Sequence, residues 1–205
     1  TLTLVTGSPP ALEERLASAV SVAQRDDPLA PVGVLLGGVL QRPYLQRLLA
    51  RTNDGIANVR FLMPSELAME LGERALVLDD RLPLPPLADR ILLQAIASNQ
   101  DGYFEPVREA PGLAEALHRL VQELRGAGYD EKSFRDAIAG ACEVEDKETA
   151  LVEIFDEFLK RRGKFYGPDD CLLASETESP TWKTLLVFGL WQAPAALVDV
   201  IGALS

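Results

Sequence analysis

The chain has 205 residues, 47% of them hydrophobic, which is enough apolar material for one large core or one core with a packed subdomain. Its 31 acidic and 20 basic residues give a formal net charge of −11, so any contact with a polyanion such as DNA has to be local. Cys142 and Cys171 lack the paired spacing of zinc or iron–sulfur ligands, which favours reduced, buried thiols over a metal site.

Short apolar runs alternate with helical patterns in the first part of the chain. The runs expected to form strands cover residues 2–6, 32–36 and 58–62, and helices are expected to follow them over residues 11–25, 42–50 and 64–73. Strands that alternate with helices predict parallel pairing through right-handed crossovers.

From Pro85 onward the predicted elements are helices without intervening strands. Apolar residues recur at helical spacing over residues 87–96, 113–124 and 151–159, and a last apolar strand is expected over residues 184–188 before a helix that starts near Pro194. We therefore expect an α/β core of residues 1–80 and 181–205 with an inserted helical subdomain of residues 81–180. An insertion of roughly a hundred residues far exceeds an ordinary connection between strands.

The turn after the first expected strand is the first place to look for phosphate binding. Set against the pattern G-x-x-x-x-G-K-[ST], Gly7 fits, but Leu12 takes the second glycine position, Glu13 the lysine position and Glu14 the hydroxyl position. Two prolines after Ser8 remove amide donors, and a carboxylate at the lysine position repels a triphosphate by roughly 1 kcal/mol or more. The sequence therefore predicts a vestigial phosphate loop that binds no nucleotide.

Several acidic residues and the one histidine resemble parts of known catalytic sites. Asp79 and Asp80 end an apolar run, as in a magnesium-binding strand, but we interpret them as the exit to a subdomain linker. Asp169 follows a proline as in a metal-dependent nuclease, yet the expected downstream carboxylate and lysine are missing. We expect Asp169 and Asp170 to start a short helix, and His118 to be structural.

The densest basic cluster follows the helix predicted over residues 151–159. Basic groups can hold a phosphate backbone while neighbouring aromatic side chains stack on bases, and this predicts the candidate DNA contacts Lys160, Arg161, Arg162, Lys164 and Tyr166. The alternative is that the cations complement the helix dipole and the aromatic side chains belong to the core.

The order of these segments resembles the N-terminal region of the AddB-type subunit of bacterial AddAB helicase-nucleases, a P-loop helicase-like protein. The likeness is carried by the opening strand with its Gly7 turn and by residues 58–68, 111–128, 150–159, 167–170, 185–190 and 194–197. Phe188 and Gly189 resemble the family's motif-II turn, although Phe188 stands where an acid is expected. The resemblance implies a helicase domain-1-like fold that works on broken DNA ends beside an active helicase subunit.

We therefore expect a helicase-like scaffold, part of a longer protein, that positions DNA and docks a motor subunit in double-strand-break repair and recombination. The 205 residues are expected to hold no catalytic residue, metal or cofactor, although the full-length protein could be an ATP-dependent exodeoxyribonuclease subunit. No secretory signal or membrane-length apolar run is visible, so we expect a cytoplasmic protein without a membrane partner.

Two alternatives from other classes stay open. The chain could be an active nucleotide-binding enzyme domain with an unorthodox loop, in which Asp79 and Asp80 hold the metal. It could also be a helical protein-interaction module unrelated to DNA, which its acidic charge suits. Nucleotide binding would favour the first alternative, and salt-independent binding of a protein without DNA binding would favour the second.

Overall fold

The computed structural model describes residues 3–53, 55–141, 145–175, 180 and 182–204, and it is a mixed α/β protein. The strands are β1 (Val32–Leu36), β2 (Val59–Leu62), β3 (Leu82–Pro83), β4 (Phe165–Tyr166) and β5 (Thr184–Phe188). The helices are α1 (Pro9–Ala23), α2 (Gln41–Thr52), α3 (Pro64–Leu78), α4 (Ala88–Ala97), the 3-10 helix η1 (Gly102–Val107), α5 (Pro111–Gly126), α6 (Glu131–Ala141), α7 (Asp146–Arg162), α8 (Pro168–Leu173) and α9 (Ala195–Ala203).

Three parallel strands form the main sheet, in the order β2-β1-β5. Val32 of β1 lies opposite Val59 of β2 on one side and Thr184 of β5 on the other. Every residue of β1 is buried, as expected for an uninterrupted apolar strand at the centre of a parallel sheet. The strands expected over residues 32–36 and 184–188 are present with those limits, and the strand expected from residue 58 begins one residue later.

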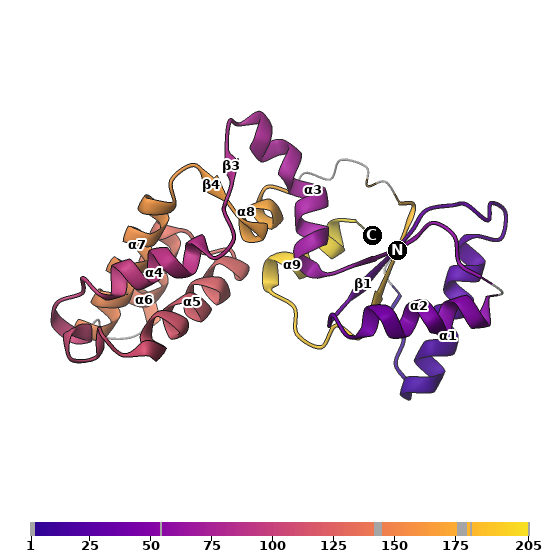
Figure 1. The fold of residues 1–205 in the computed structure, drawn as a ribbon, viewed down its shortest axis with the longest axis horizontal. Helices are drawn as coiled ribbons and strands as arrows, with labels where there is room; N and C mark the ends of the chain where they lie inside the picture. Colours follow the sequence, from indigo (N-terminus) through magenta and orange to yellow (C-terminus); the bar gives the residue numbers. More distant parts are fainter. Residues whose placement is uncertain (1–2, 54, 142–144, 176–179, 181, 205) are drawn as a thin grey trace.

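Helices cover both faces of this sheet. Because successive side chains of β1 point to opposite faces, this strand contributes to both cores. Val34 and Leu36 pack with the buried faces of α1 and α2, whereas Leu35 packs with α3, α8 and α9. Figure 1 shows the resulting layers, with α1 and α2 on one side of the strands and α3 and α9 on the other.

The helices of residues 88–162 form a second lobe with a core of its own (Figure 1). Buried residues of α4, η1, α5, α6 and α7 meet there, and the rings of Phe134 and Phe155 cross edge to face at 5.3 Å between centroids. None of the described helices is long and apolar enough to cross a membrane.

The two lobes are joined by β3, β4 and α8. β3 pairs with β4 in parallel, and α8 packs closely against α3, where a Cβ added to Gly72 would lie 1.9 Å from the carbonyl oxygen of Cys171. Cys171 and Leu172 belong to the core on the sheet side. The helices of the expected insertion thus divide between two cores, with α8 on the sheet side and α4 to α7 in the second lobe.

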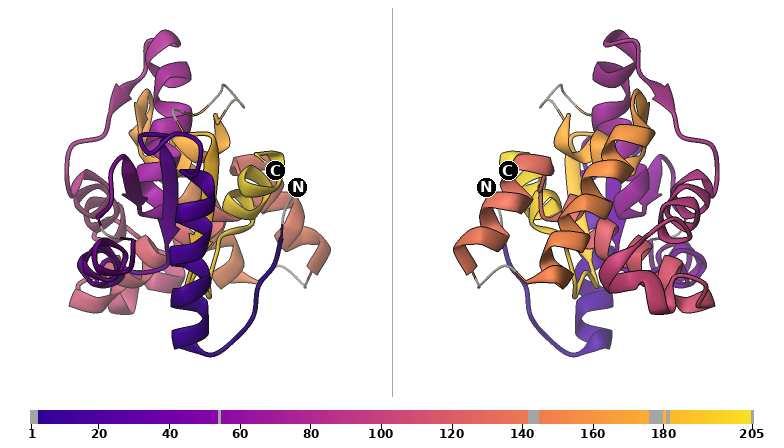
Figure 2. Two further views of the ribbon diagram at one scale, coloured as in Figure 1. Left: turned by 90° about the vertical axis from the view of Figure 1, so that its right-hand side faces the viewer. Right: turned by 90° about the vertical axis from the view of Figure 1, so that its left-hand side faces the viewer.

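The strand expected over residues 2–6 is not formed. Leu2 lies outside the described residues, and residues 3–6 pair with no described strand and leave Leu4 88% exposed. In Figure 2 this segment runs as an irregular trace outside the sheet before α1 begins. The prediction was wrong because β-branched apolar composition favours a strand, whereas a strand forms only when a neighbouring strand pairs with it.

The apolar run before Asp79 is also helical and not a strand. α3 extends five residues beyond its expected end at residue 73, so Leu76 to Leu78 form its last turn and Asp79 is its C-cap. Asp79 and Asp80 are both exposed, and Asp80 has a positive φ of 56°. The comparison with a magnesium-binding strand therefore fails on geometry.

Candidate nucleic-acid interface

The loops that follow β1 and β5 meet at the carboxyl edge of the sheet. The Gly37 amide donates to the Phe188 carbonyl at 3.3 Å, and a Cβ on Gly37 would lie 2.0 Å from the carbonyl oxygen of Gly189. From this meeting point β1 leads to α2 on one face of the sheet and β5 leads to α9 on the other. Such a divergence is where open α/β sheets place their ligands.

Phe188 and Gly189, the expected motif-II-like turn, form this contact. Phe188 is half-buried and packs against the α1–α2 core, so the aromatic ring that replaces an acid is used for packing. Gly189 has a φ of 64°, and a Cβ there would lie 2.5 Å from Nε2 of Gln41. The turn therefore lies between Gly37 of the loop after β1 and the side chain of Gln41 in α2.

The residues of the expected vestigial phosphate loop lie at the start of α1. Gly7 and Ser8 are exposed and irregular, and Leu12 is half-buried beside Gly7. A hydrogen bond with the Glu13 carboxylate raises the pKa of the Tyr44 hydroxyl of α2, and Glu14 points to solvent. Within the described part of the chain, no group of His, Cys, Asp and Glu side chains could hold a metal ion.

Exposed apolar and aromatic side chains stand at this edge. Trp191, in the loop after β5, is 76% exposed, and Tyr44 in the first turn of α2 is about half exposed. Val39 and Leu40, in the loop after β1, are exposed as well. Exposed aromatic rings at the end of a rigid sheet are the platform on which single-stranded nucleic acids stack.

The charged residues of α2 are all arginines. Arg42, Arg47 and Arg51 are its charged side chains, and the helix contains no Asp or Glu. Arg42 pairs with Glu66, which also accepts the Met63 amide at 2.7 Å; that amide bond and Arg42 lower the pKa of Glu66. Arg47 and Arg51 are exposed and form no ion pair with the residues that the structure describes. α2 runs back from the carboxyl edge, so Arg47 and Arg51 lie further along the helix, with Arg51 in its last turn. We use the name edge patch for Trp191 and Tyr44 at the edge together with Arg47 and Arg51 along α2.

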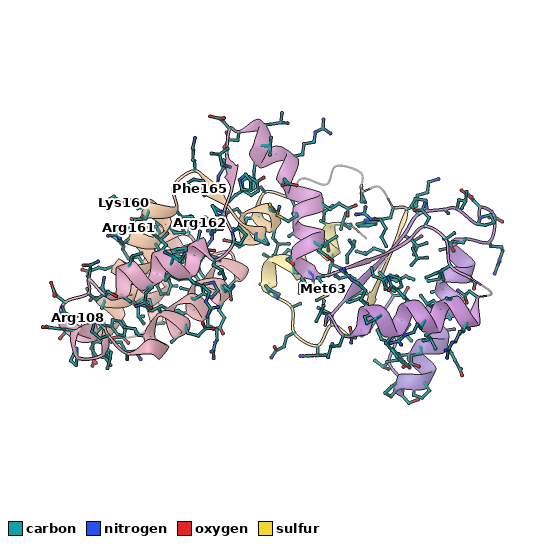
Figure 3. The ribbon with its side chains drawn as sticks, in the orientation of Figure 1. Met63, Arg108, Lys160, Arg161, Arg162 and Phe165 are labelled. Atoms are coloured by element: carbon teal, nitrogen blue, oxygen red, sulfur yellow. The ribbon has the colours of Figure 1, made fainter. Side chains whose placement is uncertain are left out.

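The basic cluster at the end of α7 lies in the other lobe (Figure 3). Lys160 and Lys164 are exposed, and Arg161 is bonded to Glu157 at 2.6 Å. Arg162 and Tyr166 are not surface residues, and their assignment as DNA contacts was wrong. Tyr166 is 2% exposed, and its hydroxyl donates to Glu73 at 3.1 Å. The pKa of this hydroxyl is raised, mainly by burial and also by the Glu73 carboxylate.

Arg162 belongs to a buried ion network that links the two lobes. It donates to both Asp169 oxygens at 2.7 and 2.8 Å and forms an ion pair with Asp170 at 2.8 Å. Arg125 of α5 bonds the same two carboxylates at 3.0 and 2.8 Å. Arg81, before β3, lies 3.5 Å from Asp170 and donates to the Phe165 carbonyl. Helices α5 and α7 and the segment before β3 are thereby fastened to the first turn of α8.

The pKa values of the network follow from burial and pairing together. Burial alone would raise the pKa of Asp169, but hydrogen bonds and charge from Arg162 and Arg125 hold it at about 2. Burial would likewise lower the pKa of Arg162, and Asp169 and Asp170 raise it instead. For Asp89, which faces Arg162 at 3.7 Å, burial prevails and raises the pKa.

The other candidate site residues from the sequence take part in helix starts, packing or the buried core. Asp169 and Asp170 do begin a short helix, and Asp170 accepts the Gly167 amide at 3.0 Å. His118 is half-buried on α5 beside Asp89. Cys171 is a buried free thiol whose pKa is raised by burial to about 12, and Cys142 lies outside the described residues.

Sequence reasoning missed both the edge patch and the ion network. The arginines of α2 left a linear signal, because three cations and no carboxylate occupy its twelve residues. The network left none, since its members are separated by up to 89 positions, from Arg81 to Asp170, and folding alone brings them together.

No protein-family model and no curated protein matches this chain. The resemblance to AddB-type subunits therefore rests on the order of the segments quoted from the sequence. What the chain does has to be argued from its own geometry.

Proposed function

We propose that this chain is a non-catalytic, helicase-like scaffold of an AddB-type DNA helicase-nuclease subunit, which positions DNA and docks a motor subunit in double-strand-break repair. The observation that carries the DNA part of the proposal is the edge patch, in which the exposed rings of Tyr44 and Trp191 at the sheet edge are combined with exposed arginines along α2. Arginines bind the phosphate backbone and aromatic rings stack on bases without sequence preference.

The overall charge makes this local patch more informative. With a net charge of −11 the molecule as a whole repels DNA, so binding requires a surface from which carboxylates are absent. Arg47 and Arg51 of α2 pair with no described carboxylate, although at the start of the helix Arg42 pairs with Glu66 and Tyr44 is bonded to Glu13. At the basic end of α7, in contrast, Glu157 pairs with both Lys160 and Arg161. We therefore place the DNA on the sheet edge in preference to α7.

The non-catalytic part of the proposal rests on the start of α1. Glu13 stands where a phosphate-binding lysine would be required, and it is bonded to Tyr44. Asp79 and Asp80 lie at the end of α3, away from the carboxyl edge where a nucleotide would sit. Both features speak against the alternative of an active nucleotide-dependent enzyme.

The proposal is tested by fluorescence anisotropy with labelled single-stranded DNA and a tailed duplex. Arg47→Glu with Arg51→Glu is expected to weaken binding at least about tenfold and to reduce the salt dependence by roughly two phosphate contacts. Trp191→Ala is expected to remove about 1–3 kcal/mol of single-strand binding through lost stacking.

The matched control reverses two exposed cations in the other lobe, Lys160→Glu with Lys164→Glu. We expect this variant to bind as the unaltered chain does. If the Lys160→Glu, Lys164→Glu variant loses DNA binding while the Arg47→Glu, Arg51→Glu variant keeps it, the DNA site lies at the end of α7. If the unaltered chain does not bind DNA, the proposal is refuted.

A further inference from the structure

α4 has two apolar faces, and the fold uses one of them. Leu93, Ile96 and Ala97 are buried in the core of the helical lobe. On the opposite side Leu87 and Ile91 are 65% and 67% exposed, and Ala95 continues the same stripe at intervals of four residues. A helix with apolar side chains on opposite faces is typical of a buried helix, so the outer face lacks a covering element.

The outer face is hollowed. Leu87, Arg90, Ile91, Gln94 and Ala95 line a surface depression of about 470 Å³. Arg90 also lines the depression, and its charge is paired with Glu115 of α5. All five residues belong to α4 or its N-cap, so the depression is an open helix face against which an amphipathic helix could lie.

Leu87 is held in a strained backbone conformation at the head of this face. Its φ is 65°, and the other positive-φ residues besides glycine in the described chain are Asn58 and Asp80. Asn and Asp tolerate the left-handed region, whereas leucine does not. The Leu87 side chain is exposed, so it contributes little to the core, and its backbone conformation disfavours leucine. Backbone strain of this kind is concentrated at functional sites.

The charge of the helical lobe limits which kind of partner can bind the outer face of α4. Residues 81–180 contain twenty acidic and twelve basic residues, so nucleic acid and a second copy of this lobe are both repelled. Asp101, Glu105 and Glu109 are exposed just beyond the C-terminal end of α4, and Arg108 pairs with Asp101 alone, at 3.3 Å. A partner that binds here should bring positive charge to that end of the depression.

We propose that the outer face of α4 docks an amphipathic helix of a partner protein, with lysines or arginines of that helix next to Asp101, Glu105 and Glu109. The inference rests on the proposed function, in which the chain docks a second subunit, and it assigns the surface and the chemistry of that contact. Leu87 and Ile91 are the apolar anchors, and the acidic end fixes the direction of the bound helix.

The test uses a labelled helical peptide of about 15 residues with leucines along one face and lysines at one end. Its affinity for the 205-residue chain is measured by fluorescence anisotropy, beside a peptide in which glutamates replace the lysines. We expect micromolar binding of the lysine peptide and at least about tenfold weaker binding of the glutamate peptide.

Variants at three positions locate the binding. Ile91→Asp is expected to weaken the lysine peptide at least about tenfold, and Ile91→Ser serves the same purpose if the aspartate perturbs the fold. Val22→Asp, an equivalent change on the exposed side of α1, should leave the affinity unchanged. Leu87→Gly should weaken binding while its Tm stays the same or rises, because glycine relieves the strain.

Equal binding by the Ile91 and Val22 variants, equal binding of both peptides, or self-association of the chain through α4 in sedimentation would overturn the proposal. The DNA measurement on the edge patch separates this result from the proposed function. If the chain binds DNA but not the peptide, the docking proposal for α4 is refuted and the proposed function is not. If it binds the peptide but not DNA, the chain is better described as a protein-interaction module unrelated to DNA.

Discussion

At the scale of single residues, the strongest electrostatic feature is Asp169 between Arg125 and Arg162. Removing one partner of a buried ion pair leaves an uncompensated charge and costs about 3–5 kcal/mol. Asp169→Asn keeps the shape of the side chain, so its effect measures the charge. We expect it to lower the free energy of unfolding at pH 7 by about 3 kcal/mol, measured by urea denaturation, whereas Asp101→Asn on the exposed surface should change it by less than about 0.5 kcal/mol.

The same residue predicts a pH dependence. The pKa of Asp169 is about 2 in the folded protein against 3.8 for an unperturbed side chain, so its stabilisation is complete above about pH 4 and is lost as the pH falls toward 2. The gap between the unaltered chain and Asp169→Asn should therefore narrow by about 1.5 kcal/mol between pH 7 and pH 2.5. A gap that stays constant would show that the residue acts through packing and not through its charge.

At the scale of elements, the close approach of α3 and α8 depends on a missing side chain. A Cβ on Gly72 would lie within 3 Å of three backbone atoms of Cys171, so Gly72→Ala has to push the two helices apart. We expect it to lower the stability by about 3 kcal/mol or more, through overpacking of backbone against backbone.

Gly140 of α6 provides the matched control for that substitution. An added Cβ there meets nothing within 4 Å, and glycine inside a helix is less stable than alanine by about 0.5–1 kcal/mol. Gly140→Ala should therefore raise Tm in the same thermal denaturation experiment in which Gly72→Ala lowers it. Similar effects of the two substitutions would contradict the close α3–α8 contact.

The elements also show how far the sequence could be read. β1 and β5 were predicted to the residue, because each is an uninterrupted apolar run bounded by glycine, proline or polar residues. The N-terminal run has a similar composition but pairs with no described strand. Whether a segment pairs depends on the strands around it and cannot be predicted from its own residues. α6 was not predicted, because Phe134 is its one fully buried side chain and its apolar face is short.

At the scale of the whole molecule, the predicted α/β organisation with an excursion of helices agrees with the parallel sheet and the second lobe (Figure 1). The candidate site was harder to predict than the fold. The basic cluster of α7 was the densest in sequence, yet folding buries Arg162. The loop that holds Trp191 meets the loop that leads into α2 through the contact of Gly37 with Gly189. A surface is a property of the folded chain, so linear density of charge is a poor guide to it.

The joint between the lobes also belongs to this scale. Four side chains from α5, α7 and α8 share charge across it, and Arg81 ties the start of β3 to the same point. DNA at the sheet edge and a partner helix on α4 would therefore be held in a fixed relation by one molecule. That arrangement is what a scaffold requires and what a nucleotide-driven motor, which has to move its parts, does not.

We propose that the chain has no working nucleotide site, and calorimetric titration with ATP and magnesium tests this proposal most directly. A variant carrying Leu12→Gly and Glu13→Lys, which supplies the missing glycine and lysine, serves as the comparison. We predict that the unaltered chain gives no heat of binding and no rise in Tm with millimolar nucleotide. Micromolar binding by the unaltered chain would contradict the account and make the nucleotide-dependent enzyme the better description.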